Sequence, residues 1–263
     1  MPDDRERSRQ VVRRVNRVQD SARLGGPDDE CELGGKGPLA TVDFFNKVLA
    51  ATPAQGDADH VPLLIQSDPR ISPRPAAIFG SGRSPLPELL AGRDRLISAG
   101  ATMLAMPCNT AHFWYSELVA NCSVPFISIV ETTLSELAKT ANRGSHIGVI
   151  ATKATLAAKI FDKSLTKAGY FPLLPQDDAM EQLVLPGIDL VKAGEASKGG
   201  ALIAEAVQAL LQQGADVVLL ACTETPLALD AVQSPLRLRC VDSTATLARA
   251  CVAWWQINGS KSV

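Results

Sequence analysis

Two stretches of the chain decide its fold: Gly100-Ala101-Thr102-Met103-Leu104-Ala105-Met106-Pro107-Cys108 and Gly214-Ala215-Asp216-Val217-Val218-Leu219-Leu220-Ala221-Cys222. In each, a Gly-Ala pair leads through a short apolar run to a cysteine, and the glycine stands eight residues before it (100 to 108 and 214 to 222). A short apolar run between turn residues is typical of a strand buried on both faces. The sequence therefore predicts two strands at equivalent places in two similar units.

The rest of the chain alternates strand and helix patterns around these stretches. Strands are predicted at 61–66, 102–106, 125–130, 146–151, 217–221 and 236–241, and helices at 41–51, 86–98, 111–121, 155–168, 179–192, 200–213 and 245–255. Such alternation is typical of parallel sheets covered by helices. We expect an α/β fold of two similar lobes, each a short parallel sheet flanked by helices. A pseudo-twofold axis would relate the lobes, with the active site between them.

The predicted division of the chain has three parts. Residues 1–28, where arginines alternate with acidic residues, have the composition of a disordered extension. Residues 29–130 would form lobe 1, joined by the C-terminal helix 244–258, and residues 131–243 would form lobe 2. The weak point is Asp29-Glu30-Cys31-Glu32-Leu33, which stands where a buried first strand is expected. Because buried carboxylates are costly, we expect this strand to be short, distorted or strained.

Composition excludes several classes of protein. The chain has 263 residues, 46% of them apolar, and a formal net charge of −2, so we expect no nucleic-acid partner. No apolar run is long enough to span a membrane, and no signal-peptide pattern is present, which favours a cytoplasmic protein. The six cysteines include no C-x-x-C pair, and the three histidines are scattered. We therefore expect neither a metal site nor a disulfide framework.

The two cysteines have surroundings that suit proton transfer. Cys108 precedes Asn109-Thr110 and Cys222 precedes Thr223-Glu224, each at a predicted helix start after a strand end. Ligands of parallel sheets bind at such strand ends, so both cysteines should face one cleft. A helix N-terminus lowers a thiol pKa and can also hold a substrate carboxylate. Two thiol groups on opposite sides of one carbon could then exchange its proton between faces without a cofactor.

These residues also carry a family resemblance. Met106-Pro107-Cys108-Asn109-Thr110-Ala111-His112 and Ala221-Cys222-Thr223-Glu224 resemble the two cysteine signatures of the aspartate/glutamate racemase family. Residues 34–41 resemble the family's glycine-rich opening loop, residues 68–74 its substrate loop, and residues 191–194 a lysine motif. Together these segments cover the chain from about Gly34 onward. The arginine and lysine segments are similar to the aspartate-racemase branch.

The resemblance implies a role for each matching residue. Cys108 and Cys222 would be the acid/base pair, with no cofactor and no metal. Arg74 and Lys192 would bind substrate carboxylates, Arg74 through its two-pronged guanidinium. The other contacts to the amino-acid substrate would be Asn109, Thr110, Thr152, Thr223 and Glu224. We expect His112 to pack or cap near the cleft, and the protein to form a homodimer.

Several alternatives stay open at this point. Aspartate is the expected substrate, but glutamate fits the same residues. Other cofactor-free enzymes of the superfamily, such as hydantoin racemases, maleate isomerases and arylmalonate decarboxylases, share the expected fold. A non-catalytic amino-acid-binding homologue is supported mainly by the acidic first strand. Lys36 and Thr225 are two further departures from the family pattern. A thiol-redox protein is disfavoured, because no two cysteines are close in sequence.

Overall fold

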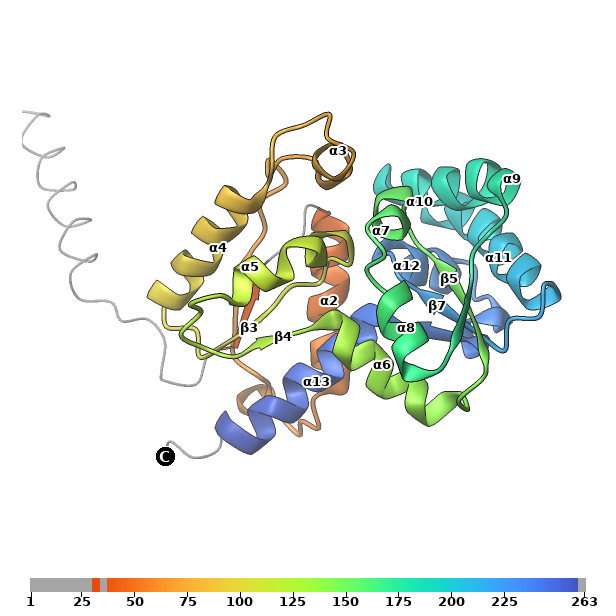
Figure 1. Ribbon diagram of the computed structural model, residues 1–263. Helices are drawn as coiled ribbons and strands as arrows, with labels where there is room; N and C mark the ends of the chain where they lie inside the picture. The colour runs from red at the N-terminus through yellow and green to blue at the C-terminus, as the bar shows by residue number, and fades with distance from the viewer. Residues whose placement is uncertain (1–29, 34–36, 260–263) are drawn as a thin grey trace, which may run out of the picture.

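The computed structural model describes residues 30–33 and 37–259, and in that part of the chain it has two parallel four-stranded sheets (Figure 1). The first sheet has the order β2 (Leu63–Gln66), β1 (Glu30–Leu33), β3 (Met103–Ala105) and β4 (Phe126–Ile127). The second has the order β6 (Phe171–Leu173), β5 (His146–Ile150), β7 (Val217–Leu220) and β8 (Cys240–Asp242). The matching orders make β3, which leads to Cys108, equivalent to β7, which leads to Cys222. The predicted α/β fold with two similar lobes is confirmed.

Helices cover both sheets. Those of lobe 1 are α2 (Pro38–Ala51), η1 (Asp57–Asp59), α3 (Arg74–Ile78), α4 (Leu86–Ser98), η2 (Thr110–Trp114) and α5 (Tyr115–Val119). Those of lobe 2 are α7 (Lys153–Ala157), α8 (Asp162–Ala168), α9 (Asp177–Ala179), η3 (Met180–Val184), α10 (Leu185–Lys192), α11 (Ala196–Gln212), α12 (Glu224–Ala231) and η4 (Pro235–Arg239). Here η marks a 3₁₀ helix, except that η3 is a π-helix.

Alternate residues of the central strands pack into different cores. On β7, Val218 and Leu220 pack with residues of α11, whereas Leu219 packs with Leu165 of α8 on the other face. On β3, Leu104 likewise packs with one helix layer, and Met103 and Ala105 with another. Because successive side chains of a strand point to opposite faces, a sheet covered on both sides needs an unbroken apolar run. This explains the composition of the two deciding stretches.

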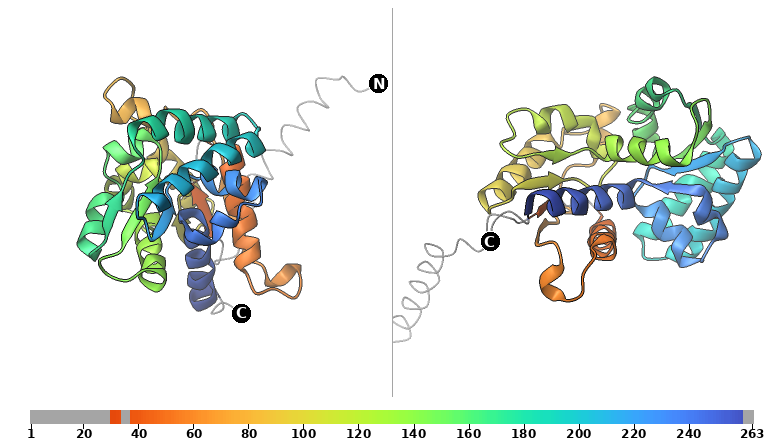
Figure 2. Two further views of the ribbon diagram at one scale, coloured as in Figure 1. Left: turned by 90° about the vertical axis from the view of Figure 1, so that its right-hand side faces the viewer. Right: turned by 90° about the horizontal axis from the view of Figure 1, so that it is seen from below.

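Two helices carry the chain between the lobes (Figure 1). Helix α6 (Ile129–Thr140) begins at the end of β4, and α13 (Ser243–Asn258) begins at the end of β8. The two pack against each other, as Figure 2 shows from below, and Thr133 Oγ1 lies 3.3 Å from Thr246 Oγ1 between them. Helix α13 then packs on α2, where Leu247 and Cys251 join the core of lobe 1.

Several predicted elements differ from the structure. The predicted strand 125–130 ends at Ile127, because Ser128 caps α6 by accepting a hydrogen bond from the Glu131 backbone N–H at 3.3 Å. Ser128 with Glu131 three residues later has the spacing of a helix-start signal, which explains why the strand ends there. Ser128 therefore corresponds to Asp242, the N-cap of α13. The sequence also missed β6, and it predicted one helix at 111–121 where η2 and α5 follow each other.

The acidic first strand has a regular backbone. Strand β1 pairs in parallel with β2 from Glu30 opposite Leu63 to Leu33 opposite Gln66, and with β3 from Glu30 opposite Met103 to Glu32 opposite Ala105. The strand is short, as predicted, but its pairing shows no distortion over these residues. The extension predicted for residues 1–28 lies outside the described residues, as does Lys36.

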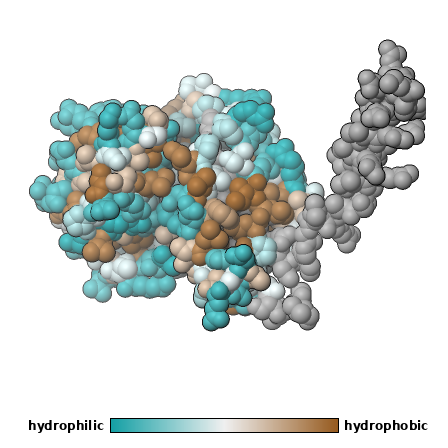
Figure 3. All heavy atoms as spheres, turned by 180° about the vertical axis from the view of Figure 1, so that it is seen from behind, coloured by the Kyte–Doolittle hydropathy of each residue, from teal (hydrophilic) through white to brown (hydrophobic). Residues whose placement is uncertain are grey.

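The molecular surface mixes polar and apolar side chains. Seen from behind, apolar side chains gather near the middle of the molecule (Figure 3). The exposed apolar residues include Leu39, Val42 and Phe45, which follow one another at helical spacing along α2. Within the described residues, no helix combines the length and apolar character required to cross a membrane.

Candidate active site

A cavity of about 390 Å³ lies between the two lobes. Lobe 1 lines it with the start of α2, with the segment around Arg74 and with the residues that follow β3, and lobe 2 lines it from the opposite side. All nine site residues predicted from the sequence line this cavity: Arg74, Cys108, Asn109, Thr110, Thr152, Lys192, Cys222, Thr223 and Glu224. The structure therefore brings the predicted residues together, from segments far apart in the chain.

Cys108 reaches the cavity directly after β3. Its thiol is partly buried, and Arg74 Nη2 donates to its Sγ at a distance of 3.8 Å. Arg74 is the first residue of the short helix α3, at the end of the segment that resembles the family's substrate loop. The guanidinium thus gives Cys108 a cationic neighbour.

His112 fixes the backbone of Cys108. Its Nε2 accepts a hydrogen bond from the Ile129 N–H at 3.1 Å, so the proton is on Nδ1, which donates to the Cys108 carbonyl at 2.9 Å. The ring stacks on Tyr115 with centroids 5.3 Å apart. Burial lowers the pKa of His112 to about 4, so the ring is neutral near pH 7. His112 therefore joins the Cys108 turn to the start of the connecting helix α6, in agreement with the predicted packing role.

Cys222 has the opposite kind of neighbour. Its thiol is buried and donates to Glu224 Oε2 at 3.0 Å, and Thr223 Oγ1 donates to the same oxygen at 2.9 Å. Burial, followed by the charge and hydrogen bond of Glu224, raises the pKa of Cys222 well above its ordinary value. The sequence predicted the reverse, a pKa lowered by a helix N-terminus. That prediction was wrong for Cys222, because burial and Glu224 outweigh the helix start.

Gly37 and Thr225 pack closely around Glu224 and Cys222. An added Cβ on Gly37, at the start of α2, would stand 3.2 Å from Glu224 Oε1, so a larger residue would crowd the carboxylate. Thr225 is fully buried, and its hydroxyl donates to the Cys222 carbonyl at 2.7 Å. This departure from the family pattern is therefore accommodated, since the extra polar group is satisfied.

Lys192 supplies a second cation to the cavity. Its side chain is about half exposed, and Nζ lies 3.1 Å from Asp189 Oδ1. Burial opposes the charge of Lys192, but the neighbouring Cys222, Glu224 and Asp189 outweigh this effect and raise the pKa of the lysine. Lys192 therefore stays protonated, and it places a positive charge on the lobe 2 side of the cavity.

Asn109 and a group of threonines complete the polar lining. Asn109 is 2% exposed, and neither polar atom of its side chain has a hydrogen-bond partner among the described residues. Across the cleft, Thr110 Oγ1 lies 2.7 Å from Thr155 Oγ1 and 3.3 Å from Thr152 Oγ1. Sequence reasoning missed Thr155, although its place three residues after the N-cap Thr152 was a usable signal.

The described residues contain no group of three or more His, Cys, Asp or Glu side chains placed to hold a metal ion. The polar groups of the cavity are two thiols, two cations, a buried carboxylate, an amide and several hydroxyls. Such a set can bind a small zwitterion with carboxylate groups and transfer protons to it.

A family model described as Asp/Glu/Hydantoin racemase matches residues 33–251 of the chain. The chain belongs to this family. It is 29% identical over 227 residues to the broad specificity amino-acid racemase RacX of Bacillus subtilis, covering 84% of this chain and 95% of that protein. An aspartate racemase of Picrophilus torridus is similar in structure, with a TM-score of 0.77, 29% identity, and coverage of 87% of this chain and 94% of that one.

A glutamate racemase of Francisella tularensis is similar in fold, with a TM-score of 0.63 at 14% identity, covering 89% of this chain and 83% of that one. The resemblance predicted from the cysteine signatures is confirmed. The family and its named members support the interpretation of this chain as an amino-acid racemase.

Proposed function

We propose that this protein racemises an acidic amino acid, with aspartate as the expected substrate, by proton transfer between Cys108 and Cys222 and without a cofactor. The observation that carries the proposal is the presence of both cysteines, from equivalent strand ends of the two lobes, in one interlobe cavity. Thiols that approach from opposite lobes can address opposite faces of one carbon. The buried and unpartnered Asn109 side chain supports a ligand between them.

The unequal surroundings of the cysteines support different first roles for them in the proposed mechanism. Cys108, beside Arg74, acts as the thiolate base and removes the α-proton, and the electron pair left on carbon is delocalised into the substrate carboxylate. Cys222, whose thiol donates to Glu224, gives its proton to the opposite face. The configuration inverts, and the enzyme is left with the Cys108 thiol and the Cys222 thiolate. Solvent exchange, or turnover in the other direction, restores the first form.

The charges of the cavity support a dicarboxylate substrate. Arg74 and Lys192 stand on different lobes, so each can bind one carboxylate of aspartate, and Glu224 offers a partner for the substrate ammonium. One observation favours a wider range as a second candidate. Lys192 already pairs with Asp189, and the similar RacX is named as broad in specificity. The amino-acid substrate is the only partner proposed here, and the homodimer stays a prediction.

The test is α-proton exchange in heavy water, followed by NMR, with both enantiomers of aspartate, glutamate and alanine. We expect loss of the α-proton signal and formation of the opposite enantiomer with aspartate, and negligible reaction with alanine. Exchange with alanine at a comparable rate would favour the broad-range candidate. Binding of aspartate without exchange would show a non-catalytic homologue.

The two-cysteine mechanism is tested by Cys108→Ser and Cys222→Ser. Each should lower racemisation by at least about a hundredfold, the usual contribution of general acid–base catalysis. Cys122→Ser is the matched control, because this cysteine is partly buried against the core of lobe 1 and does not line the cavity. Normal turnover by both catalytic variants would contradict the mechanism. Inhibition by a chelator would contradict the absence of a metal cofactor.

A further inference from the structure

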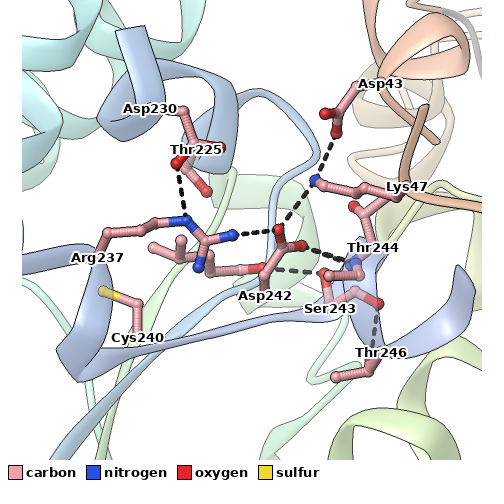
Figure 4. A network of polar contacts seen from close by, with 12 residues as sticks. Asp43, Lys47, Thr225, Asp230, Arg237, Cys240, Asp242, Ser243, Thr244 and Thr246 are labelled. Carbon is pink, nitrogen blue, oxygen red and sulfur yellow. Dashed lines mark hydrogen bonds and ion pairs between the residues drawn. The ribbon is translucent and has the colours of Figure 1, made fainter. Parts of the chain in front are cut away.

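A partly buried network of charges joins the two lobes away from the cavity (Figure 4). Lys47 on α2 of lobe 1 contacts Asp43 Oδ2 at 2.5 Å and Asp242 Oδ2, at the end of β8 in lobe 2, at 2.9 Å. Arg237 contacts the same Asp242 oxygen at 2.7 Å and Asp230 Oδ1 at 3.1 Å. The Lys47 side chain is only 14% exposed and that of Asp242 only 3%.

Asp242 uses its two oxygens for different purposes. Oδ1 caps α13 by accepting hydrogen bonds from the backbone N–H groups of Thr244 and Ala245, at 2.9 and 3.0 Å. Oδ2 is thereby left for the two cations. The Arg237 pair lies within lobe 2 and the cap is at the first turn of the connecting helix α13, whereas Lys47 reaches Asp242 from α2 of lobe 1.

Each residue of the Lys47–Asp242 ion pair is connected to the surroundings of Cys222. Next to Asp242, Ser243 Oγ donates to the carbonyl of Leu220, two residues before Cys222, at 2.9 Å. At the other end, Lys47 is carried on α2, whose first turn lines the cavity and whose Gly37 lies against Glu224. Lys47 follows Gly37 by ten positions along α2, a rise of about 15 Å. The helix therefore transmits a tilt at Lys47 to the cavity wall.

We propose that Lys47 is a positioning residue, which ties α2 to Asp242 and so holds the Gly37 wall of the cavity against Glu224 and Cys222. Loss of the ion pair lets the start of α2 move relative to lobe 2. Glu224 and the thiol that it holds then lose their fixed environment, whereas Cys108, held by His112 within lobe 1, keeps its own. This inference rests on the proposed function for its kinetic readout only.

The test compares Asp43→Asn with the double variant Asp43→Asn/Lys47→Met. Removing Lys47 alone would leave two buried carboxylates facing each other and could unfold the protein. In the Asp43→Asn background, the replacement of Lys47 removes one of the two cations that contact Asp242. The ion pair between Asp242 and Arg237 remains. Lys139→Met is the control, since Lys139 is an exposed lysine of α6 that pairs with Glu136 far from Asp242 in the sequence.

Two readouts are measured, kcat/KM for racemisation of aspartate and the alkylation rate of each cysteine by iodoacetamide, followed by mass spectrometry. We expect Asp43→Asn and Lys139→Met to stay within about threefold of the parent. The double variant should lose at least about tenfold in kcat/KM, and its Cys222 should be alkylated at least about threefold faster, with Cys108 within about twofold.

Unchanged alkylation of Cys222 in the double variant, or an equal rise at both cysteines, overturns the proposal. The alkylation arm does not need racemase activity. A protein without activity on aspartate therefore contradicts the proposed function, while the alkylation result still decides the role of Lys47.

Discussion

Replacing Glu224 by Gln should make Cys222 more reactive. In the structure the Cys222 thiol donates to Glu224 Oε2 at 3.0 Å, and ionising the thiol would place two negative charges at that distance. At an effective dielectric constant of about 20, this repulsion amounts to about 5.5 kcal/mol. Lys192 and small rearrangements offset part of it. A residual of about 1.4 kcal/mol would still change the thiolate population tenfold.

The assay is alkylation by iodoacetamide at pH 7, quantified for each cysteine by mass spectrometry. We expect the Cys222 rate to rise at least about tenfold in Glu224→Gln, because the thiolate is the reacting form. Cys108 in the same sample is the internal reference, and Glu205→Gln, an exposed glutamate on α11, is the matched control. An unchanged or slower reaction at Cys222 would refute the claim that Glu224 keeps this thiol protonated.

The same variant should alter the pH dependence of stability. The folded-state pKa of Cys222 is raised, so its stabilising contribution is complete below the ordinary thiol pKa and is lost as the pH rises toward the folded value. Unfolding midpoints should therefore fall between about pH 8 and 10 in the parent. The unfolding midpoint should fall less in Glu224→Gln, because without the carboxylate the folded-state pKa of Cys222 is raised less. Equal slopes for the two proteins would count against the assigned cause of the shift.

Two further predictions concern residues on either side of the cavity. Arg74→Lys should lower kcat/KM on aspartate at least about tenfold, because one ammonium cannot reproduce a bidentate guanidinium, and unchanged kinetics would remove Arg74 from the site. Thr155→Val deletes the hydroxyl that lies 2.7 Å from Thr110 across the cleft, and should raise KM several-fold. Thr155→Ser should restore the parent value. Equal KM values for the two Thr155 variants would show that the hydroxyl contact has no role.

The sequence alone determined the two central strands, β3 and β7, and the cysteines that follow them, whereas it missed β6 and predicted a strand at 236–241 where η4 precedes the short strand β8. These features depend on local patterns: the Gly-Ala turns, the apolar runs before Cys108 and Cys222, and the polar residues behind each cysteine. A strand covered on both faces needs an unbroken apolar run whatever its partners are, so the pattern is readable without them. The site residues came from the family motifs, and the structure places all of them at one cavity.

The tertiary structure decided what surrounds these residues. The pKa of Cys222 moved against the prediction, because a helix-start argument counts nearby backbone dipoles and omits burial and the Glu224 carboxylate. The Lys47–Asp242 ion pair and the Thr110–Thr155 contact join residues from different lobes. Such contacts depend on how helices and sheets pack, so a local signal such as the spacing of Thr155 from the N-cap Thr152 can mark a residue but cannot identify its partner on the other lobe. Electrostatic interactions and interlobe contacts arise from distances in space, and only the folded chain sets those distances.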